Sequence, residues 1–280
     1  MPRDVDILVD LNEDELLKLR EKYNGVEDAY HIYTFIDVAI RMWETRELIV
    51  TSPGNAWMED GSLIIFSERD CPNIFMYSLD KSYKKISQAL LKTKRIDQKK
   101  ALKFRNIFED YMDIIMEVVN KLGRQVTDIS ENNLYAMNIQ KAKALKIEFP
   151  TEAYVKRLGR EHAKEVDAVW PHRFEHSDKM VANWIEKNVG FGVFLKHNGA
   201  LVSWVLQGPK GHMNLLQTLE GYMHRGYGKL MVRVLAKYLA ENGHVPVAIV
   251  LTNNLLSNKL FSSLGFEMIQ KTYFFRTAPE

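Results

Sequence analysis

The sequence contains a single cysteine, Cys71, among its 280 residues. One cysteine excludes an intrachain disulfide framework and a cysteine-rich metal site, and it fits a reducing compartment. Long apolar runs are missing as well. The longest, such as Val245–Leu251, are far shorter than the roughly 18 residues that a bilayer-spanning helix needs. The sequence therefore predicts no membrane segment and no membrane partner.

An excess of one charge is also missing, because 38 Lys and Arg residues face 36 Asp and Glu residues. A balanced chain shows no signal for binding polyanions, so we expect no nucleic-acid partner.

With 46% hydrophobic and 26% charged residues, wholesale disorder is excluded. The start Met1-Pro-Arg-Asp-Val-Asp brings acidic residues within six positions, unlike a signal or transit peptide, which favours the cytoplasm.

The length allows one large domain or two modest ones, and the change of polarity pattern around Leu145–Pro150 favours two. We therefore expect one domain over residues 1–148 and a second over residues 149–280. In the first, Asn12 is the expected N-cap of a helix. The basic stretch from Lys81 to Gly123 predicts helices, and its lysines are either a partner-binding stripe or a solvated face.

The second half has a more regular pattern of short strands and amphipathic helices. Strands are expected around residues 192–196, 200–206 and 213–219, with Asn198-Gly199 as a hairpin turn. A helix over residues 230–239 and a buried strand over 245–251 follow, then a helix over 254–264 and a strand over 273–276. Antiparallel hairpins leading into a β-α-β-α-β tail predict an α/β (α+β) fold, with a mixed, mostly antiparallel sheet flanked by helices.

The most informative segment is the glycine-containing loop between an expected strand and an expected helix, Leu219–Lys229. Gly226 and Gly228 let the backbone turn closely, so that successive amides point at one place at the start of the helix. A pyrophosphate fits such a site, with Arg225 and Lys229 supplying positive charge. Taken alone, a Gly-x-Gly before a helix equally fits a plain strand–helix turn.

Together with a second segment further on, this loop resembles the acetyl-CoA-binding half of the GNAT acyltransferase superfamily. The signature there is Arg/Gln-x-x-Gly-x-Gly/Ala, followed after a strand by Asn-x-x-Ala/Ser-x-x-Leu-Tyr-x-x-Leu-Gly-Phe. The matching residues are Gly226, Gly228, Asn254, Ser257, Leu260, Leu264, Gly265 and Phe266. Two positions depart: Met223 stands where Arg or Gln is usual, and Phe261 where Tyr is usual.

Further segments resemble the glycine N-acyltransferase family within that superfamily, namely Val202-Ser-Trp, Thr218-Leu-Glu-Gly-Tyr and Leu134-Tyr-Ala-Met. The resemblance implies a degenerate GNAT-like first domain without its own cofactor and a second domain that binds acyl-CoA. It also implies direct transfer of an acyl group, from acetyl-CoA or another acyl-CoA, to a small amine such as glycine or another amino acid. By the same resemblance a mitochondrial location stays open.

The resemblance assigns site residues as follows. His212 stands where the family has a glutamate as general base, and Glu220 is the second candidate; His212 is otherwise a turn residue. Imidazole, with a pKa near 6.5, suits removal of a proton from an ammonium. The acyl-CoA would contact the backbone of Leu219, the loop residues Arg225, Gly226, Tyr227, Gly228 and Lys229, and Asn254, Ser257 and Phe261. Asn254 is alternatively a helix N-cap.

A second hypothesis from a different class is a catalytically weak acyl-CoA-binding or interaction protein on a GNAT scaffold. It is motivated by Met223 and by Phe261, which lacks the phenol that protonates the departing thiolate in many relatives. The spacing of His172 and His176 does not predict a metal site without a third ligand. Cys71 is expected to be idle, because direct transfer needs no covalent intermediate.

Overall fold

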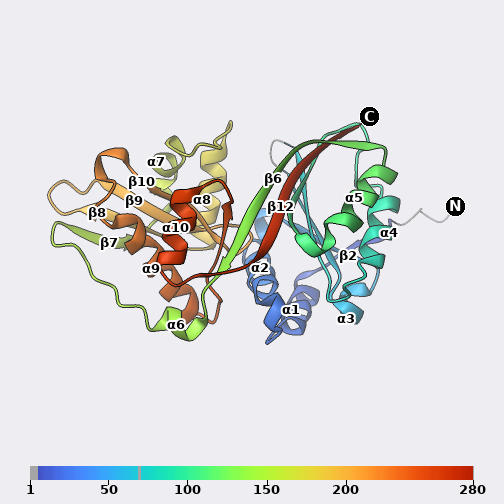
Figure 1. Ribbon diagram of the computed structural model, residues 1–280, viewed down its shortest axis with the longest axis horizontal. Helices are drawn as coiled ribbons and strands as arrows, with labels where there is room; N and C mark the ends of the chain where they lie inside the picture. Colours follow the sequence, from blue (N-terminus) through green and yellow to red (C-terminus); the bar gives the residue numbers. More distant parts are fainter. Residues whose placement is uncertain (1–5, 69–70, 280) are drawn as a thin grey trace. The chain divides into compact units, whose positions relative to one another are not determined.

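The structure, a computed structural model, describes residues 6–68 and 71–279. In these residues the chain forms twelve strands and ten α-helices (Figure 1). They fall into two compact units: unit 1 comprises residues up to Asn133 and from Gln270 onward, and unit 2 comprises Leu134–Ile269. The expected domain boundary at residue 148 stays a prediction. No helix in the described residues is long and apolar enough to cross a membrane.

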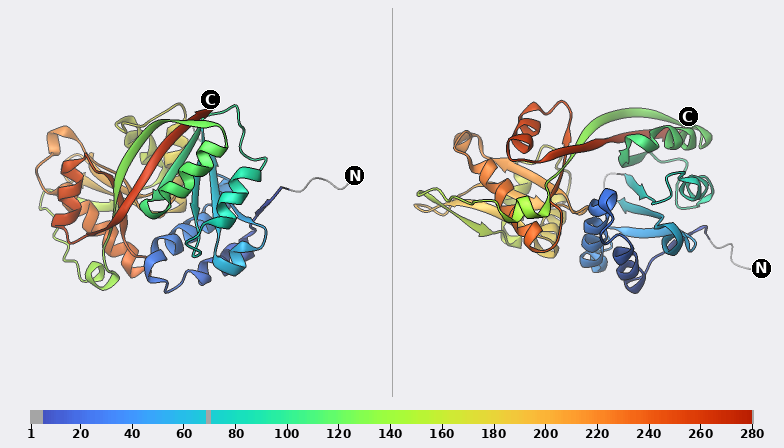
Figure 2. Two further views of the ribbon diagram at one scale, coloured as in Figure 1. Left: turned by 45° about the vertical axis from the view of Figure 1, so that its right-hand side comes forward. Right: turned by 60° about the horizontal axis from the view of Figure 1, so that its bottom comes forward.

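Unit 1 is a mixed sheet with helices on both faces, in the strand order β1-β2-β3-β4-β5-β12-β6. Its strands are β1 (Leu8–Asp10), β2 (Ile49–Pro53), β3 (Leu63–Glu68), β4 (Pro72–Tyr77), β5 (Leu102–Phe108), most of β6 (Arg124–Ala136) and most of β12 (Glu267–Pro279). Its helices are α1 (Glu13–Lys22), α2 (Tyr30–Arg41), α3 (Ala56–Asp60), α4 (Lys84–Lys92) and α5 (Met112–Lys121). Figure 2 shows α1 and α2 on one side of these strands and α4 and α5 on the other.

Unit 2 has the strand order β11-β10-β9-β8-β7, and the end of β6 lies beside β11. Its strands are β7 (Ala153–Arg157), β8 (Gly190–Leu195), β9 (Leu201–Gln207), β10 (Met213–Thr218) and β11 (Val247–Leu251). Its helices are α6 (Ile139–Lys143), α7 (Ala163–Ala168), α8 (Ser177–Lys187), α9 (Tyr227–Glu241) and α10 (Leu255–Ser263). In each unit one described strand pair is parallel, β4–β5 and β10–β11, and the other described pairs are antiparallel. The predicted α+β fold with a mixed, mostly antiparallel sheet is confirmed.

Local sequence explains why several elements begin where they do. The Asn12 side chain accepts a hydrogen bond from the Glu15 amide at 3.0 Å, and the Glu15 carboxylate accepts one from the Asn12 amide at 2.8 Å. This reciprocal capping box satisfies two amides that the first turn of α1 leaves unpaired. The turn at Asn198-Gly199 joins β8 to β9, with Gly199 at φ +70°. Both features match the expectations from sequence.

The core of unit 2 is built by the apolar face of α9 against the sheet. Leu230, Met231 and Leu235 lie in one cluster with Val202 and Val205 of β9, which are completely buried. Because a helix buries residues three and four apart, this stripe fixes the rotation of α9 about its axis. The packing therefore also fixes the direction in which the first turn of α9 points.

One region differs from the helical expectation. Within the stretch Lys81–Gly123 the structure has a strand, β5, between helices α4 and α5. Leu102 and Phe104 are buried whereas Lys103 and Arg105 are half-buried, which is the alternation of a strand. Phe104 stacks on Phe275 of β12, with ring centroids 4.7 Å apart. β12, which pairs with β5, is distant in sequence. The helical spacing of the residues around β5 therefore gave a helical prediction for the whole stretch.

A histidine in unit 1 makes the stability pH-dependent. His31 is half-buried, but its Nε2 atom is shielded from solvent and has no hydrogen-bond partner among the described residues. The rings of Tyr30, Tyr77 and Phe108 meet it edge to face at centroid distances of 5.1–5.7 Å. Burial lowers the pKa of His31 from 6.5 to about 3. The unfolded chain therefore binds a proton that the folded chain excludes between these two values.

We expect the free energy of unfolding to fall as the pH drops below 6.5, by up to about 1.4 kcal/mol per pH unit from this residue. The contribution is fully present above pH 6.5 and is lost progressively toward pH 3. In His31→Phe the pH dependence should be weaker by that amount, while His197→Gln, in an exposed turn, should keep the wild-type dependence. Urea unfolding at pH 7 and pH 5 gives the change in the free energy of unfolding with pH for each protein. If this change is the same in wild type and His31→Phe, His31 is not its source.

Candidate functional site

The two parallel strands of unit 2 meet at a single residue pair. Met213 of β10 is opposite Ala248 of β11, and no other register pair is described between these strands. Both strands continue, β10 to Thr218 and β11 to Leu251. Two parallel strands that pair at their beginnings and then diverge leave a gap between their carboxyl ends, lined by backbone groups that lack a strand partner.

A β-bulge in β10 accompanies the divergence. Asn214 is opposite Leu206 of β9, but the next paired residue, Gln217, is opposite Trp204, so β10 carries one extra residue. Within the bulge Leu215 has a positive φ of +47°, which is uncommon for leucine. Its amide donates to the Asn214 side chain at 2.8 Å. The strained residue is therefore held by its own neighbour.

The backbone beyond the bulge presents hydrogen-bonding groups to the gap. The Leu219 amide donates to the Val202 carbonyl at 2.9 Å, and the Ser203 hydroxyl donates to the Gln217 carbonyl at 2.9 Å. Gln217 and Leu219 therefore face β9. Because successive residues of a strand alternate their direction, the amide and carbonyl of Thr218 face the other edge, toward β11.

The loop after β10 ends at the first turn of α9. Gly226 is the N-cap of α9 with φ +82°, a conformation that glycine adopts without strain. The first amides of an α-helix have no partner within the helix and point along its axis. In this turn they belong to Tyr227, Gly228 and Lys229. Arg225 lies beside the turn, with its guanidinium 5.2 Å from the centre of the Tyr222 ring.

Tyr227 contributes its backbone to this turn, because its side chain is committed elsewhere. It is 2% exposed, and its hydroxyl donates to the Glu152 carboxylate at 2.6 Å. Burial and the Glu152 contact raise the pKa of Tyr227, and the same hydrogen bond lowers the pKa of Glu152. The contact ties the start of α9 to the residue before β7. Sequence reasoning did not single out Glu152.

On the other side of the gap, α10 begins directly after Asn254. The Asn254 side chain accepts a hydrogen bond from the Ser257 amide at 3.1 Å, so Asn254 is the helix N-cap. Asn258 links the start of α10 to the end of β11, because its side-chain amide donates to the carbonyls of Leu251 and Asn254, each at 2.8 Å. The Tyr135 hydroxyl in turn donates to the Asn258 side chain at 2.9 Å. Spacing alone gave no signal for Asn258 or Tyr135.

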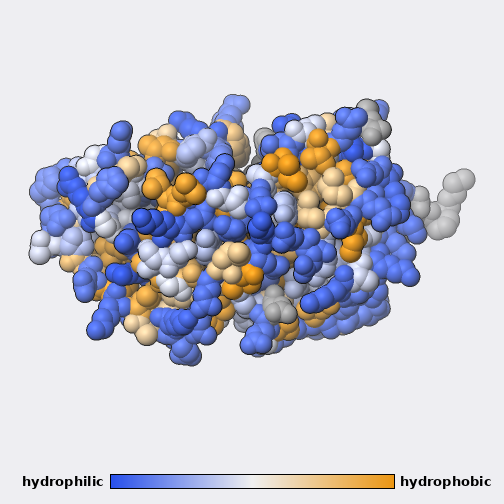
Figure 3. All heavy atoms as spheres, in the orientation of Figure 1, coloured by the Kyte–Doolittle hydropathy of each residue, from blue (hydrophilic) through white to orange (hydrophobic). Residues whose placement is uncertain are grey.

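Phe261 lies in the core of unit 2. It is 4% exposed, stacks on Tyr135 with ring centroids 6.0 Å apart, and meets Phe266 edge to face at 5.1 Å. By contrast, the first residues of α10 are exposed: Leu255 is 76% exposed and Leu256 is 84% exposed. Figure 3 shows apolar atoms in the region of α10 on this face of unit 2.

The two candidate bases lie at opposite ends of β10. His212 is half-buried, directly before Met213, and its carbonyl accepts a hydrogen bond from Gly208 at 2.8 Å. Glu220 is exposed and follows Leu219 at the start of the 3₁₀ turn Glu220–Tyr222. Seven residues lie between the two, and the six of them in β10, at about 3.3 Å each, span about 20 Å. They therefore cannot both act on the same atom.

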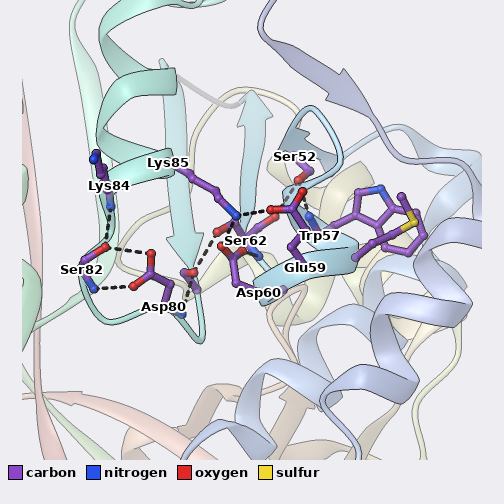
Figure 4. A network of polar contacts seen from close by, with 12 residues as sticks. Ser52, Trp57, Glu59, Asp60, Ser62, Asp80, Ser82, Lys84 and Lys85 are labelled. Atoms are coloured by element: carbon purple, nitrogen blue, oxygen red, sulfur yellow. Dashed lines mark hydrogen bonds and ion pairs between the residues drawn. The ribbon is translucent and has the colours of Figure 1, made fainter.

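The equivalent turn of unit 1, between β4 and α4, is occupied by its own side chains (Figure 4). The Asp80 carboxylate accepts hydrogen bonds from the amide and the hydroxyl of Ser82, at 2.9 and 2.8 Å. The Ser82 hydroxyl then accepts the Lys84 amide at 3.3 Å. Internal side chains thus satisfy two amides at or just before the start of α4, those of Ser82 and Lys84.

The lysine that follows this turn is also engaged. Lys85 contacts Glu59 at 2.5 Å and Asp60 at 2.7 Å, and these contacts raise its pKa. Ser62 and Ser78 share a hydrogen bond of 2.8 Å between two buried hydroxyls. The turn of unit 1 is therefore closed by internal polar contacts, whereas the α9 turn of unit 2 is held by the Gly226 backbone.

Family models match both halves of the chain. A model described as FR47-like protein matches residues 190–275, and a domain of unknown function, DUF5645, matches residues 7–118. The first match spans β8 through most of β12 and so contains the gap and both turns that follow it. No curated protein matches the chain in sequence.

Several solved structures share the fold. A Drosophila protein is similar over 98% of this chain and 99% of its own, with a TM-score of 0.85 and 17% identity. A tandem GNAT protein from the clavulanic acid biosynthesis pathway is similar over 96% and 97% of the two chains, with a TM-score of 0.61 and 10% identity. A GCN5-related N-acetyltransferase from Sphaerobacter thermophilus is similar over 97% of this chain and 96% of its own, with a TM-score of 0.54 and 10% identity.

These similarities define the class. The chain is a GNAT-fold protein of tandem architecture, with an FR47-like C-terminal domain and an N-terminal DUF5645 domain. At identities of 10–17% the structures show the fold alone.

The two glycines of the α9 turn should respond differently to alanine. Nothing lies within 4 Å of a Cβ added at Gly226, so the cost there is the φ of +82°, about 1 kcal/mol. A Cβ at Gly228 would meet the Thr218 hydroxyl at 3.6 Å, an ordinary contact at a helical position. We expect Gly226→Ala to lower the free energy of unfolding and Gly228→Ala to be neutral or stabilising. Chemical denaturation of both variants checks this, and equal losses would contradict it.

Proposed function

We propose that the protein is an N-acyltransferase that moves an acyl group from acetyl-CoA, or a similar acyl-CoA, to a small amine such as glycine or another amino acid. The supporting observation is the divergence of β10 and β11 after one residue pair, next to a bulge and directly before the uncrowded first turn of α9. The gap would hold the extended pantetheine arm of acyl-CoA, and the first turn of α9 would bind its pyrophosphate.

The chain's own residues supply binding and orientation in this proposal. The amides of Tyr227, Gly228 and Lys229, beside Gly226, would hold the pyrophosphate, with Arg225 and Lys229 adding charge. The backbone amide and carbonyl of Thr218 would pair with the amides of the pantetheine arm, in the way a strand adds to a sheet edge. The backbone of Leu219, also expected from sequence to contact acyl-CoA, is already engaged, because its amide donates to Val202 and its carbonyl accepts from Tyr222. Asn254 and Ser257 at the start of α10 would lie on the opposite side, with Phe261 packed behind them in the core. Bound acyl-CoA supplies the activated acyl group.

His212 is the proposed general base. It directly precedes the single β10–β11 pair and is two residues from Asn214, where the bulge begins. An amine must lose a proton before it attacks a carbonyl carbon, and an imidazole near its pKa can take that proton at neutral pH. Glu220 stays the second candidate, at the far end of the strand.

A second candidate function is a catalytically weak acyl-CoA-binding protein. The burial of Phe261, at 4% exposure, favours it, since this side chain has no hydroxyl and stacks within the core. Met223, 44% exposed before the α9 turn, also departs from the usual basic or amide residue. Both candidates use the same acyl-CoA site and differ only in turnover.

The protein family and the cellular compartment are two further parts of this proposal. The segments Val202-Ser-Trp and Thr218-Leu-Glu-Gly-Tyr support a glycine N-acyltransferase-like protein. The single cysteine fits a reducing compartment such as the cytoplasm, with a mitochondrial location as the alternative. Residues 1–148 would be a degenerate domain without a cofactor, which the closed turn around Asp80 supports.

Turnover decides between the two candidates. With acetyl-CoA and a panel of amino acids, we expect release of CoA that depends on the amine. His212→Ala should lower kcat by about 100-fold or more while leaving the Kd for CoA unchanged, as expected on losing a general base. Glu220→Gln is the matched comparison and should stay close to wild type.

If CoA binds but no amine is acylated, the protein is the weak binder of the second candidate. If His212→Ala keeps the wild-type rate and Glu220→Gln loses it, the base is Glu220. Absence of any effect of CoA or acyl-CoA on the melting temperature would remove both candidates.

The number of CoA molecules bound tests the difference between the two turns. Calorimetric titration should give one site per chain. Lys229→Gln should weaken CoA binding about tenfold, because a charge-assisted contact to phosphate is lost. Lys84→Gln, at the start of α4 in unit 1, should leave the Kd unchanged. Two CoA sites per chain, or a larger loss of CoA affinity in Lys84→Gln than in Lys229→Gln, would contradict the proposal that the turn before α4 binds no CoA.

A further inference from the structure

Two asparagine side chains lie at the two sides of the β10–β11 gap, beyond the described pair of the two strands. Asn214 is on β10, directly before the bulge, and Asn258 is near the start of α10, the helix that follows β11. Both residues are half-buried. Each side chain makes hydrogen bonds to backbone groups of the strand or turn beside it, which fixes the local path of the chain.

The Asn258 carboxamide holds the end of β11. The Pro246 carbonyl, directly before β11, accepts a hydrogen bond from the amide of Met137, which follows β6. Because backbone groups alternate along a strand, Leu251, five residues further on, faces the other edge, toward β10. Its carbonyl accepts the Asn258 side-chain amide at 2.8 Å and the Asn254 amide at 3.0 Å. A side chain of α10 therefore takes the place of a strand partner at this edge.

The two ends of the Asn258 carboxamide contact different groups, so its orientation is fixed. Its nitrogen also donates to the Asn254 carbonyl at 2.8 Å, and its oxygen accepts the Tyr135 hydroxyl at 2.9 Å. Tyr135 is 5% exposed and stacks on Phe261, so the core holds its hydroxyl in place. A carboxamide has donors on nitrogen and acceptors on oxygen, so Tyr135 keeps the nitrogen turned toward the end of β11.

On the β10 side it is the oxygen of the Asn214 carboxamide that contacts the backbone. A bulge leaves the extra residue of a strand without its regular partner. The Leu215 amide, inside the bulge, donates to the Asn214 oxygen at 2.8 Å, which supports the positive φ of Leu215. The Asn214 side chain also lies against Gly208, where an added Cβ would be 2.9 Å from its nitrogen and 3.0 Å from its Cβ atom. A side chain at position 208 would therefore displace Asn214.

We propose that Asn214 and Asn258 are positioning residues that hold the β10–β11 gap open for the pantetheine arm of acyl-CoA. The gap is then formed before the ligand arrives, so binding does not have to separate two paired strands. This role rests on the proposed function, because both side chains lie at the same acyl-CoA site. The oxygen of Asn214 and the nitrogen of Asn258 set the spacing of that site.

Replacing each asparagine by aspartate should give opposite results, because aspartate keeps the oxygen and loses the nitrogen. Asn258→Asp should weaken CoA binding about tenfold, since the Leu251 carbonyl loses its donor and faces a carboxylate. Asn214→Asp should bind CoA within about threefold of wild type, because its carboxylate still accepts the Leu215 amide. Asn214→Leu, which lacks the oxygen, should weaken CoA about tenfold. Calorimetric titration of the full chain measures each Kd.

A fragment of CoA shows whether the effect lies in the gap. The fragment, 3′-phosphoadenosine 5′-phosphate, has the nucleotide of CoA and no pantetheine arm, so Asn258→Asp should leave its Kd unchanged. Gly208→Ala, which displaces the Asn214 side chain without replacing it, should weaken CoA as Asn214→Leu does. Asn198→Asp is the matched control and should bind as wild type does, because the Asn198 oxygen also accepts a backbone amide, that of Ala200 at 3.1 Å, in the β8–β9 turn.

Equal losses of CoA and of the nucleotide fragment in Asn258→Asp would overturn the proposal, as would equal Kd values for CoA in Asn214→Asp and Asn214→Leu. If Asn258→Asp fails to fold, Tyr135→Phe decides. This variant keeps the ring on Phe261, removes the hydroxyl that orients Asn258 and should weaken CoA about threefold. A wild-type Kd for CoA in Tyr135→Phe would then overturn the proposal.

Turnover separates the positioning role from the proposed function. In an acyltransferase, Asn258→Asp should raise the KM for acetyl-CoA about tenfold with little change of kcat. CoA binding that Asn258→Asp weakens, with no amine acylated, supports the positioning role and removes the acyltransferase. Turnover of Asn258→Asp with the wild-type KM supports the acyltransferase and overturns the positioning role. If the wild type binds no CoA, both are removed.

Discussion

The organisation of unit 2 depends on the extra residue in β10. Backbone amides and carbonyls must find partners, so parallel strands normally pair along their whole length. The bulge after Asn214 changes the path of β10, and pairing with β11 is described only at Met213. The buried face of α9 then fixes where the chain goes next, so the helix start opens beside the gap. The gap beside β10 and the position of the first turn of α9 therefore follow from one inserted residue and one buried helix face.

Local patterns predicted most of unit 2 because its elements are short, consecutive and periodic. The Asn198-Gly199 turn, the α9 stripe and the strand at β11 are all confirmed by the structure. Sequence left Asn254 open between a cap and a ligand contact, and its bond to the Ser257 amide shows that it caps α10. Capping does not exclude a ligand contact, since the carboxamide nitrogen has its own donors.

What sequence reasoning missed are partners far apart in the chain. The strand β5 was hidden because its alternation of apolar and basic residues is short and its partner, β12, follows more than 150 residues later. Tyr135 and Asn258 are separated by 123 positions, yet they join the start of α10 to β6. Glu152 and Tyr227 are separated by 75. No local propensity encodes such contacts, because they arise only when the sheet order is known.

The last strand has a consequence for the order in which the chain folds during synthesis. Within unit 1, β12 lies between β5 and β6, so β5 lacks this neighbour until residues 270–279 have left the ribosome. All of unit 2 is translated before that point. Until then β5 presents an open edge with Phe104 beside it, the kind of edge that invites pairing with other chains. The nascent first half therefore carries an unpaired strand edge until the last residues of the described chain are made.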